Sequence, residues 1–318
     1  MLSGIEAVKG KTDPKLIRMS DEYAKDILGA QAYAPWLYVY SAVADEFREG
    51  WMPDNYYGKV VIPAIQGRYM QLDTLPAATN QLFQSNAFPD LAYFVNGVFR
   101  SKNLAVLGED ELRETLFAGR DRVVFKLEES LQGLGVFFFD RDSFSISKVQ
   151  AFGNGFFQEY IDQHQFFGDL EPNSVATLRV TTVFDGTGIS MRAFHLRLGR
   201  SEDTHVKAVS QIVIPVDRAT GELGIVGYLP SWNTITEHPD TKVSFSNRVI
   251  PCFESCVALA QELHESIPYV GAVGWDMVVD SSNTIKVMEW NARHNGIKLA
   301  EAAQGPCFAD LGWEKLWR

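Results

Sequence analysis

The chain has 318 residues, of which 46% are hydrophobic and 22% are charged, so it carries enough apolar material for about two globular domains. These values exclude a disordered, collagen-like or coiled-coil chain. With 29 Lys and Arg residues against 40 Asp and Glu residues, the net charge is −11. This balance argues against nucleic acid or an anionic membrane as a partner, but not against a small anion, which needs only a local cluster of positive charge.

The predicted elements alternate between helices and strands along the chain. Apolar residues recur at helical spacing in residues 32–51 and again in 75–88, so we expect residues 1–85 to form a mainly helical N-terminal region. The pair Asn96-Gly97 predicts a turn between two short strands. Further strands are predicted at 122–129, 135–140, 156–161, 176–184, 191–199, 210–217, 272–280 and 285–292, and helices at 109–119, 251–267 and 296–305.

Long strands mixed with helices and hairpin turns predict an α+β fold that is largely antiparallel. A Rossmann series is disfavoured because no GxGxxG motif opens a helix after a strand. No stretch approaches the roughly 18 apolar residues of a membrane span, and the first residues lack the apolar core of a secretory signal. We therefore expect no membrane span and a cytoplasmic location. Without neighbouring histidines, Cys252 and Cys256 fall short of a zinc site, and with Cys307 they are interpreted as reduced thiols.

Two acids and an amide lie on the last two predicted strands. Side chains alternate along a strand, so Glu289 and Asn291 project from the same face. A hairpin through residues 281–283 would allow Asp276 to join them. Carboxylate and amide oxygens suit Mg²⁺, which also takes phosphate oxygens and water. Paired acids also occur as solvated surface, but the apolar residues around this set favour a ligand.

A lysine and a glycine-rich loop form the second candidate element. Lys126 lies within an apolar strand, where an unpaired ammonium group is costly, so it requires an anionic partner. The loop that follows contains Gln132, Gly133 and Gly135, and glycines let the backbone approach phosphate and donate N–H groups. An ordinary hairpin turn is the alternative interpretation of this loop.

Two more predicted strands carry polar side chains. The strand at 156–161 runs into a polar turn, where main-chain groups can bind an adenine edge and Glu159 or His164 a ribose hydroxyl. A buried strand with a polar end is the alternative. Arg179 lies within an apolar strand, and its planar guanidinium suits phosphate or carboxylate. For Arg179 the alternative is a salt bridge to an acid within the fold.

Taken together, the order of these motifs along the chain resembles that of the ATP-grasp superfamily. The sequence around the motifs resembles the sugar-transfer-associated branch of that superfamily. The resemblance covers about residues 90–305. It rests on the segments QEYIDQH at 158–164, PNSVATLRVTT at 172–182, LRLGR at 196–200, VDRATGELG at 216–224, HPDT at 238–241, VGWDMVV at 273–279 and MEWNA at 288–292.

The resemblance implies an ATP-grasp fold in which two α+β subdomains hold ATP. Residues 86–157 would form the lid subdomain with the glycine-rich loop, and residues 158–318 the C-terminal subdomain with the magnesium site. Lys126 would contact the α- and β-phosphates, and Arg179 the γ-phosphate and the acyl phosphate formed from it. Arg293 would steady the transferred group or the substrate carboxylate. The remaining implied contacts are nucleotide binding by Gln132, Gly133, Gly135, Gln158, Glu159, Tyr160, Ile161 and His164, and Mg²⁺ binding by Asp276, Glu289 and Asn291.

The chain also departs from the family's pattern. Such proteins usually carry an earlier lysine that touches phosphate, but none occurs between Lys59 and Lys102. Arg68 and Arg100 are candidate substitutes, and the alternative is that this contact is absent. The acceptor side also differs: a VDN-then-GG stretch usually follows LRLG, and DTHVKA stands at 203–208 instead. His205 and Lys207 are candidates there for acceptor binding or proton transfer, with a solvated loop as the alternative.

The function implied is an ATP-dependent carboxylate–amine ligase that works through an acyl phosphate, with ATP and Mg²⁺ as cofactors, in natural-product or polysaccharide-modification biosynthesis. Its substrates would be a small carboxylate and an amine. The sequence is also compatible with a homodimer. A small-molecule kinase of the same fold is one alternative. A nucleotide-binding module without catalysis is the other, favoured by the missing lysine and opposed by the intact acid set.

Overall fold

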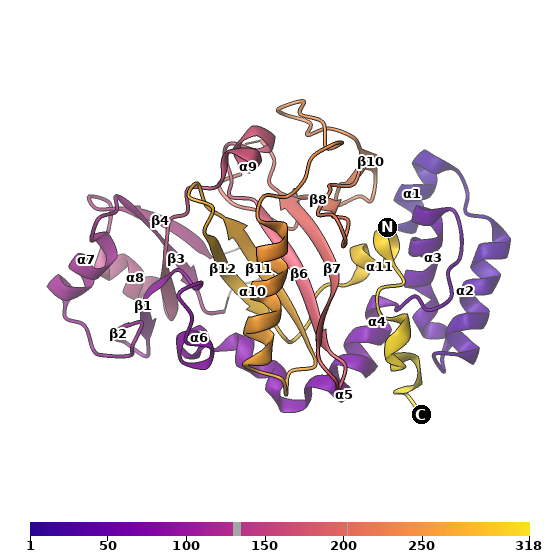
Figure 1. Cartoon of the computed structure of the whole chain (residues 1–318), viewed down its shortest axis with the longest axis horizontal. Coiled ribbons are helices and arrows are strands. Elements are labelled where there is room, and N and C mark those ends of the chain that lie inside the picture. Colours follow the sequence, from indigo (N-terminus) through magenta and orange to yellow (C-terminus); the bar gives the residue numbers. More distant parts are fainter. Residues whose placement is uncertain (130–134, 202) are drawn as a thin grey trace.

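The computed structural model describes residues 1–129, 135–201 and 203–318, which form two antiparallel sheets and a set of N-terminal helices (Figure 1). The smaller sheet has five strands in the order β2-β1-β5-β3-β4. Its core is rich in phenylalanine, including Phe125 and Phe157, and α7 (Glu109–Phe117) packs against it. Its strands are β1 (Asp90–Val95), β2 (Val98–Ser101), β3 (Arg122–Leu127), β4 (Val136–Asp140) and β5 (Gly155–Glu159).

The larger sheet has seven strands in the order β10-β9-β8-β7-β6-β11-β12. Strand β11 is buried along its whole length, because α10 (Phe253–Glu265) packs on the same sheet (Figure 1). Its strands are β6 (Thr177–Phe184), β7 (Ile189–Leu198), β8 (Ile212–Pro215), β9 (Gly227–Tyr228), β10 (Thr234–Ile235), β11 (Ala272–Val279) and β12 (Ile285–Asn291).

The N-terminal helices lie on the far side of the larger sheet from the five-stranded sheet (Figure 1). Helix α3 (Ala34–Ala44) packs against α1 (Leu2–Lys9), α2 (Pro14–Asp26) and the C-terminal helix α11 (Lys298–Gln304). A helical segment then crosses along one end of the larger sheet to the five-stranded sheet. It comprises α4 (Asp54–Tyr56), the π-helical turn Tyr57–Val61, α5 (Ile62–Gln66), the 3₁₀-helix Gly67–Thr74 and α6 (Pro76–Phe83).

The predicted α+β architecture with antiparallel sheets is confirmed, and the differences have local causes. The helix expected at 32–51 ends at Ala44, because Asp45 adopts a left-handed conformation with φ of 58°. The helix expected at 75–88 ends at Phe83, since Gln84 is left-handed too. Two short helices, α8 (Ile146–Phe152) and α9 (Gln165–Leu170), and the two-residue strands β9 and β10 were not predicted. Within the described ranges, no helix is long and apolar enough to cross a membrane.

Candidate active site

A cavity of about 560 Å³ lies between the two sheets. Strands β3, β4 and β5 line one side of it, and β6, β7, β11 and β12 line the other. Residues from the N-terminal segment and from the loop after β7 complete its wall. Ten of the residues singled out from the sequence line it: Lys126, Gln158, Glu159, Tyr160, Ile161, Arg179, His205, Asp276, Glu289 and Asn291.

The larger sheet presents a row of four polar side chains from four neighbouring strands. Glu289 on β12 pairs in register with Asp276 on β11, Asp276 with Arg179 on β6, and Arg179 with His195 on β7. Residues that pair directly across a sheet project from the same face. The hairpin expected from the sequence therefore does bring Asp276 and Glu289 side by side, and the Asn291 amide nitrogen lies 3.5 Å from the Asp276 carboxylate.

Arg179 and Asp276 form a buried ion pair with two parallel hydrogen bonds. Nε and Nη2 of Arg179 donate to the two carboxylate oxygens at 2.6 and 2.7 Å, and Nη1 donates to the carbonyl of Asn295 at 2.6 Å. Gly274 makes room for this arrangement, since a Cβ there would lie 3.0 Å from Nη1 of Arg179. Burial alone would raise the pKa of Asp276, but Arg179 and Arg197 lower it to about 2. Arg179 therefore forms a salt bridge within the fold, which is the alternative to ligand binding that the sequence left open.

Lys126 and Glu289 remain without such partners. Among the described residues, Lys126 makes no hydrogen bond or ion pair, and its ammonium lies 6.0 Å from the centre of the Phe156 ring. Burial lowers the pKa of Lys126, against the opposing influence of Glu289 and Asp90. Desolvation within the cavity and the Asp276 carboxylate raise the pKa of Glu289, whose side chain is exposed to the cavity. Both groups line the same cavity, so an anion and a cation bound there would each relieve an electrostatic penalty.

Two residues of this site were missed in the sequence. Arg197 lines the cavity, and its Nε donates to Nε2 of His195 at 3.3 Å. Burial and the neighbouring Arg179 lower the pKa of Arg197 to about 10, and burial lowers that of His195 well below its usual range. The available signal was the spacing of His195, Arg197 and their apolar neighbours, which puts two polar side chains on one face of an apolar strand.

Residues 158–161, which are expected to bind adenine and ribose, line the cavity, but two of their side chains already interact with other parts of the protein. Gln158 donates from its amide to Asp90 at 2.8 Å and to the carbonyl of Met288 at 3.1 Å. Glu159 lies within ion-pair distance of Arg120 and Lys286, at 3.2 and 3.6 Å. This segment would therefore contact a ligand mainly through its main-chain N–H and C=O groups and its apolar side chains.

Four expected site residues lie outside the cavity wall. His164 caps α9 by accepting from the Phe166 backbone N–H at 3.0 Å, and Lys207 pairs with Asp203 at 3.0 Å. Arg293 is exposed, and Gly135, with φ of 82°, directly precedes β4. The proposed substitutes for the early lysine, Arg68 and Arg100, do not line the cavity either. Gln132 and Gly133 lie outside the described residues.

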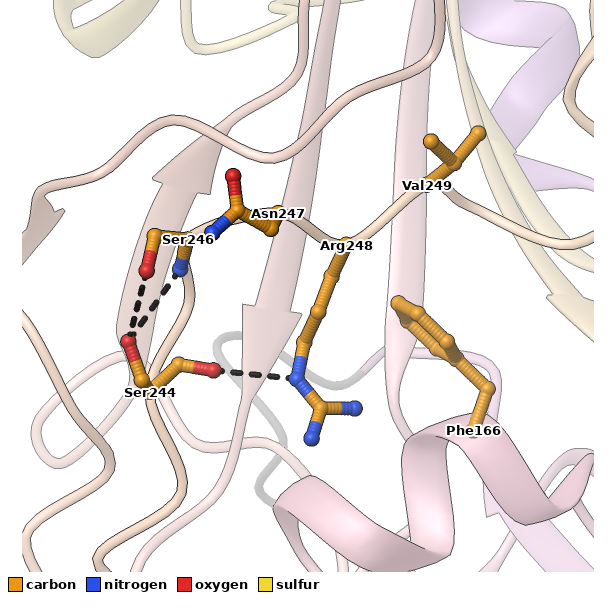
Figure 2. Close-up of a pocket in the computed structure, with 6 residues that line it drawn as sticks. All are labelled: Phe166, Ser244, Ser246, Asn247, Arg248 and Val249. Carbon is orange, nitrogen blue, oxygen red and sulfur yellow. Dashed lines mark hydrogen bonds between the residues drawn. The ribbon is translucent and has the colours of Figure 1, made fainter.

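Two other groups of residues, one around Arg248 and one around His238, lie away from this cavity. Figure 2 shows a shallow surface pocket in which Arg248 lies across from Phe166 and donates to the carbonyl of Ser244 at 3.0 Å; it holds none of the expected residues. Glu171, His238 and Asp240 are close enough to hold a metal. Both ring nitrogens of His238 are already engaged, Nδ1 with backbone N–H groups and Nε2 with the carbonyl of Gly199, so this cluster is structural.

The sequence was compared with known proteins. A model of the sugar-transfer associated ATP-grasp family matches residues 143–311, and no curated protein matches the chain. Among solved structures, biotin carboxylase from Campylobacter jejuni is 12% identical, with 98% of this chain and 67% of that one covered and a TM-score of 0.49. D-alanine–D-alanine ligase from Bacillus anthracis is 15% identical, with 78% and 65% covered and a TM-score of 0.42.

The biotin carboxylase domain of 2-oxoglutarate carboxylase from Hydrogenobacter thermophilus is 10% identical, with 78% of this chain and 45% of that one covered and a TM-score of 0.46. For this domain and for N5-carboxyaminoimidazole ribonucleotide synthetase from Thermotoga maritima, the chain spans about half of the matched protein's length, with 45% and 49% of those chains covered.

Proposed function

The chain belongs to the sugar-transfer-associated ATP-grasp family, whose model covers just over half of it, and from this we propose that it is an ATP-dependent carboxylate–amine ligase. The fold is accordingly the ATP-grasp fold. We further propose a division into residues 1–85, a lid subdomain at 86–157 and a C-terminal subdomain at 158–318. The family's association with sugar transfer favours a role in polysaccharide modification or natural-product biosynthesis.

One observation carries the proposal: Lys126, which has no ion-pair partner among the described residues, shares a cavity large enough for a nucleotide with the carboxylates of Asp276 and Glu289. Lys126 and Arg197 offer positive charge there, and Glu289 offers negative charge beside it. An unpaired ammonium in such a cavity is destabilising until an anion binds. A polyphosphate would balance the positive charges of Lys126 and Arg197, and a divalent cation bound with it would balance the negative charge of Glu289.

The donor set also suits Mg²⁺. Glu289 accepts no hydrogen bond from the described residues, and Asn291 and Asp276 lie next to it on paired strands. Two carboxylates and an amide oxygen are hard ligands of the kind that Mg²⁺ prefers. When bound, the ion would neutralise negative charge on the phosphates. Asp276 would also act as a ligand to the ion if its carboxylate oxygens contacted both the ion and Arg179.

The proposed reaction has two steps. A substrate carboxylate oxygen attacks the terminal phosphorus of ATP, the bond from that phosphorus to the bridging oxygen breaks, and an acyl phosphate and ADP form. An amine nitrogen then attacks the acyl carbon, the carbon–oxygen bond to phosphate breaks, and an amide, inorganic phosphate and a proton are released. The protein contributes positioning, charge neutralisation by Lys126 and Arg197, and exclusion of water.

The test is ADP formation by the purified protein with MgATP and a panel of small carboxylic acids, each with and without amino acids or amino sugars. The ligase predicts amine-dependent ADP release with equal amounts of phosphate and an amide detected by mass spectrometry. ADP with a phosphorylated product and no free phosphate would instead show the kinase. Nucleotide binding without turnover on any pair would show the binding module.

The matched variants for this test are Lys126→Gln and Lys148→Gln. Lys126 faces the cavity, so we expect its loss to weaken ATP binding about tenfold or more. Lys148 is exposed on α8 and makes no side-chain hydrogen bond to the described residues, so its variant should behave as the unmodified protein. Equal ATP affinity in both variants would contradict the assignment of Lys126.

A further inference from the structure

We propose that Arg197, rather than Arg179, is the guanidinium that binds an oxyanion in the cavity, and that His195 is the residue that positions it. The identity of that oxyanion as a substrate carboxylate or a transferred phosphate rests on the proposed function. The existence of the binding group does not, because it follows from the hydrogen bonds of three side chains on β6 and β7.

Arg179 has little capacity left for a ligand. Its Nε and Nη2 are held by the two oxygens of Asp276 and its Nη1 by the carbonyl of Asn295. Only 6% of the Arg179 side chain is exposed. A guanidinium in a bidentate pair with a carboxylate is already in its preferred geometry, so an incoming anion would have to compete with Asp276. Arg179 therefore serves to hold Asp276 in place.

Arg197 is in the opposite situation. Its Nε donates to His195, but neither of its Nη nitrogens donates a hydrogen bond within the part of the chain that the structure describes. Nη1 is 3.7 Å from Asp276, beyond hydrogen-bond distance, and 19% of the side chain is exposed to the cavity that it lines. Two neighbouring guanidinium nitrogens can bind a carboxylate or phosphate side by side, and in Arg197 the Nη pair is available for this.

His195 explains how the fork keeps its orientation. It is two residues before Arg197 on β7, only 4% exposed, and its Nε2 accepts the Nε–H of Arg197. An imidazole nitrogen accepts only when it carries no proton, so this contact requires neutral His195 with its proton on Nδ1. Burial and the two neighbouring arginines favour that neutral form. The hydrogen bond occupies Nε and leaves both Nη nitrogens for the anion.

The first experiment measures binding of inorganic phosphate, and separately of acetate, to the nucleotide-free protein by isothermal titration calorimetry. We expect Arg197→Gln to weaken binding of at least one of these anions about tenfold or more. Arg68→Gln is the control, since Arg68 is exposed and outside the cavity. Tighter phosphate binding would identify the transferred phosphate as the natural anion, and tighter acetate binding the substrate carboxylate. Affinities within twofold for Arg197→Gln and the unmodified protein, or no binding of either anion to the latter, would overturn the proposal.

The second experiment isolates His195. His195→Gln retains an oxygen that can accept the Nε–H of Arg197, whereas His195→Leu fills similar space without an acceptor. We expect the glutamine variant to bind the anion within about threefold of the unmodified protein and the leucine variant to resemble Arg197→Gln. Equal binding by both variants, with thermal melts confirming that both are folded, would refute the positioning role. MgATP binding to the unmodified protein is measured in parallel. If the protein does not bind MgATP, the proposed ligase function is wrong, whereas the role of Arg197 in anion binding is still decided by the phosphate and acetate titrations.

Discussion

The charged side chains of the cavity divide into one closed pair and three available groups. Arg179 and Asp276 neutralise each other through two hydrogen bonds. Lys126, Arg197 and Glu289 instead face the cavity without a hydrogen-bonded partner of opposite charge among the described residues. The closed pair gives the sheet a rigid polar centre, and the other three supply the charge that a ligand would meet.

At the residue scale, Glu289→Gln tests the metal assignment. Removing the carboxylate charge should weaken Mn²⁺ binding, followed by electron paramagnetic resonance in the presence of ADP, about tenfold or more. The fold should not suffer, because the raised pKa of Glu289 means that its charged form is disfavoured in the folded protein. Glu262→Gln, an exposed site on α10, is the control. Unchanged Mn²⁺ affinity in Glu289→Gln would show that the metal site is elsewhere.

At the element scale, the five-stranded sheet depends on close packing around β5. Gly155 begins this strand and pairs with Leu127 on β3 and Phe94 on β1. A Cβ on Gly155 would lie 2.4 Å from the carbonyl oxygen of Lys126 and 2.5 Å from the Phe125 ring. Because backbone and a buried ring cannot both move away cheaply, only glycine fits here. The same close contact lies between β5 and β3, the strand that carries Lys126.

We therefore expect Gly155→Ala to lower the free energy of unfolding by about 1–3 kcal/mol, as overpacking of a core does. Urea denaturation followed by tryptophan fluorescence measures the change. Gly188→Ala is the matched control, since no atom lies within 4 Å of its added Cβ and its φ is not in the left-handed region. A Gly155→Ala protein as stable as the control variant would show that the sheet yields at this point.

At the scale of the whole molecule, a buried carboxylate on α11 is one of the links between the C-terminal part and the segment that follows α3. Glu301 on α11 accepts from the backbone N–H of Met52 at 2.6 Å and from that of Cys307 at 2.7 Å. The Trp51 indole donates to the carbonyl of Glu301 at 2.8 Å. Burial raises the pKa of Glu301 to about 7, although these backbone bonds oppose the shift.

This raised pKa predicts a pH dependence of stability. The folded protein binds the Glu301 proton up to about pH 7, whereas an unfolded chain releases it near pH 4.5. Stability from this group is therefore present below about pH 4.5 and declines as the pH rises to about 7, by at most about 3 kcal/mol. Glu301→Gln should remove this decline from urea unfolding measured at pH 5 and pH 8, and Glu262→Gln should retain it. An identical pH dependence in both variants would contradict the shift.

Much of the architecture could be read along the chain, because strand and turn patterns are local. The turn at Asn96-Gly97 and the final hairpin with Asp276 and Glu289 on one face follow from side-chain alternation and turn chemistry, and the structure contains both. Local patterns failed where a single residue turned left-handed, as at Asp45, or where tertiary contacts stabilised the short helices α8 and α9.

The candidate site divides in the same way. Lys126, Arg179, Asp276 and Glu289 could be recognised from the sequence as polar groups on apolar strands that need partners. Their actual partners depend on the folded chain: Arg179 is paired with Asp276, and Lys126 is not paired among the described residues. Pairing depends on register and spacing between strands far apart in the chain. For the same reason Arg197 and His195, to which the sequence assigned no role, became part of the site.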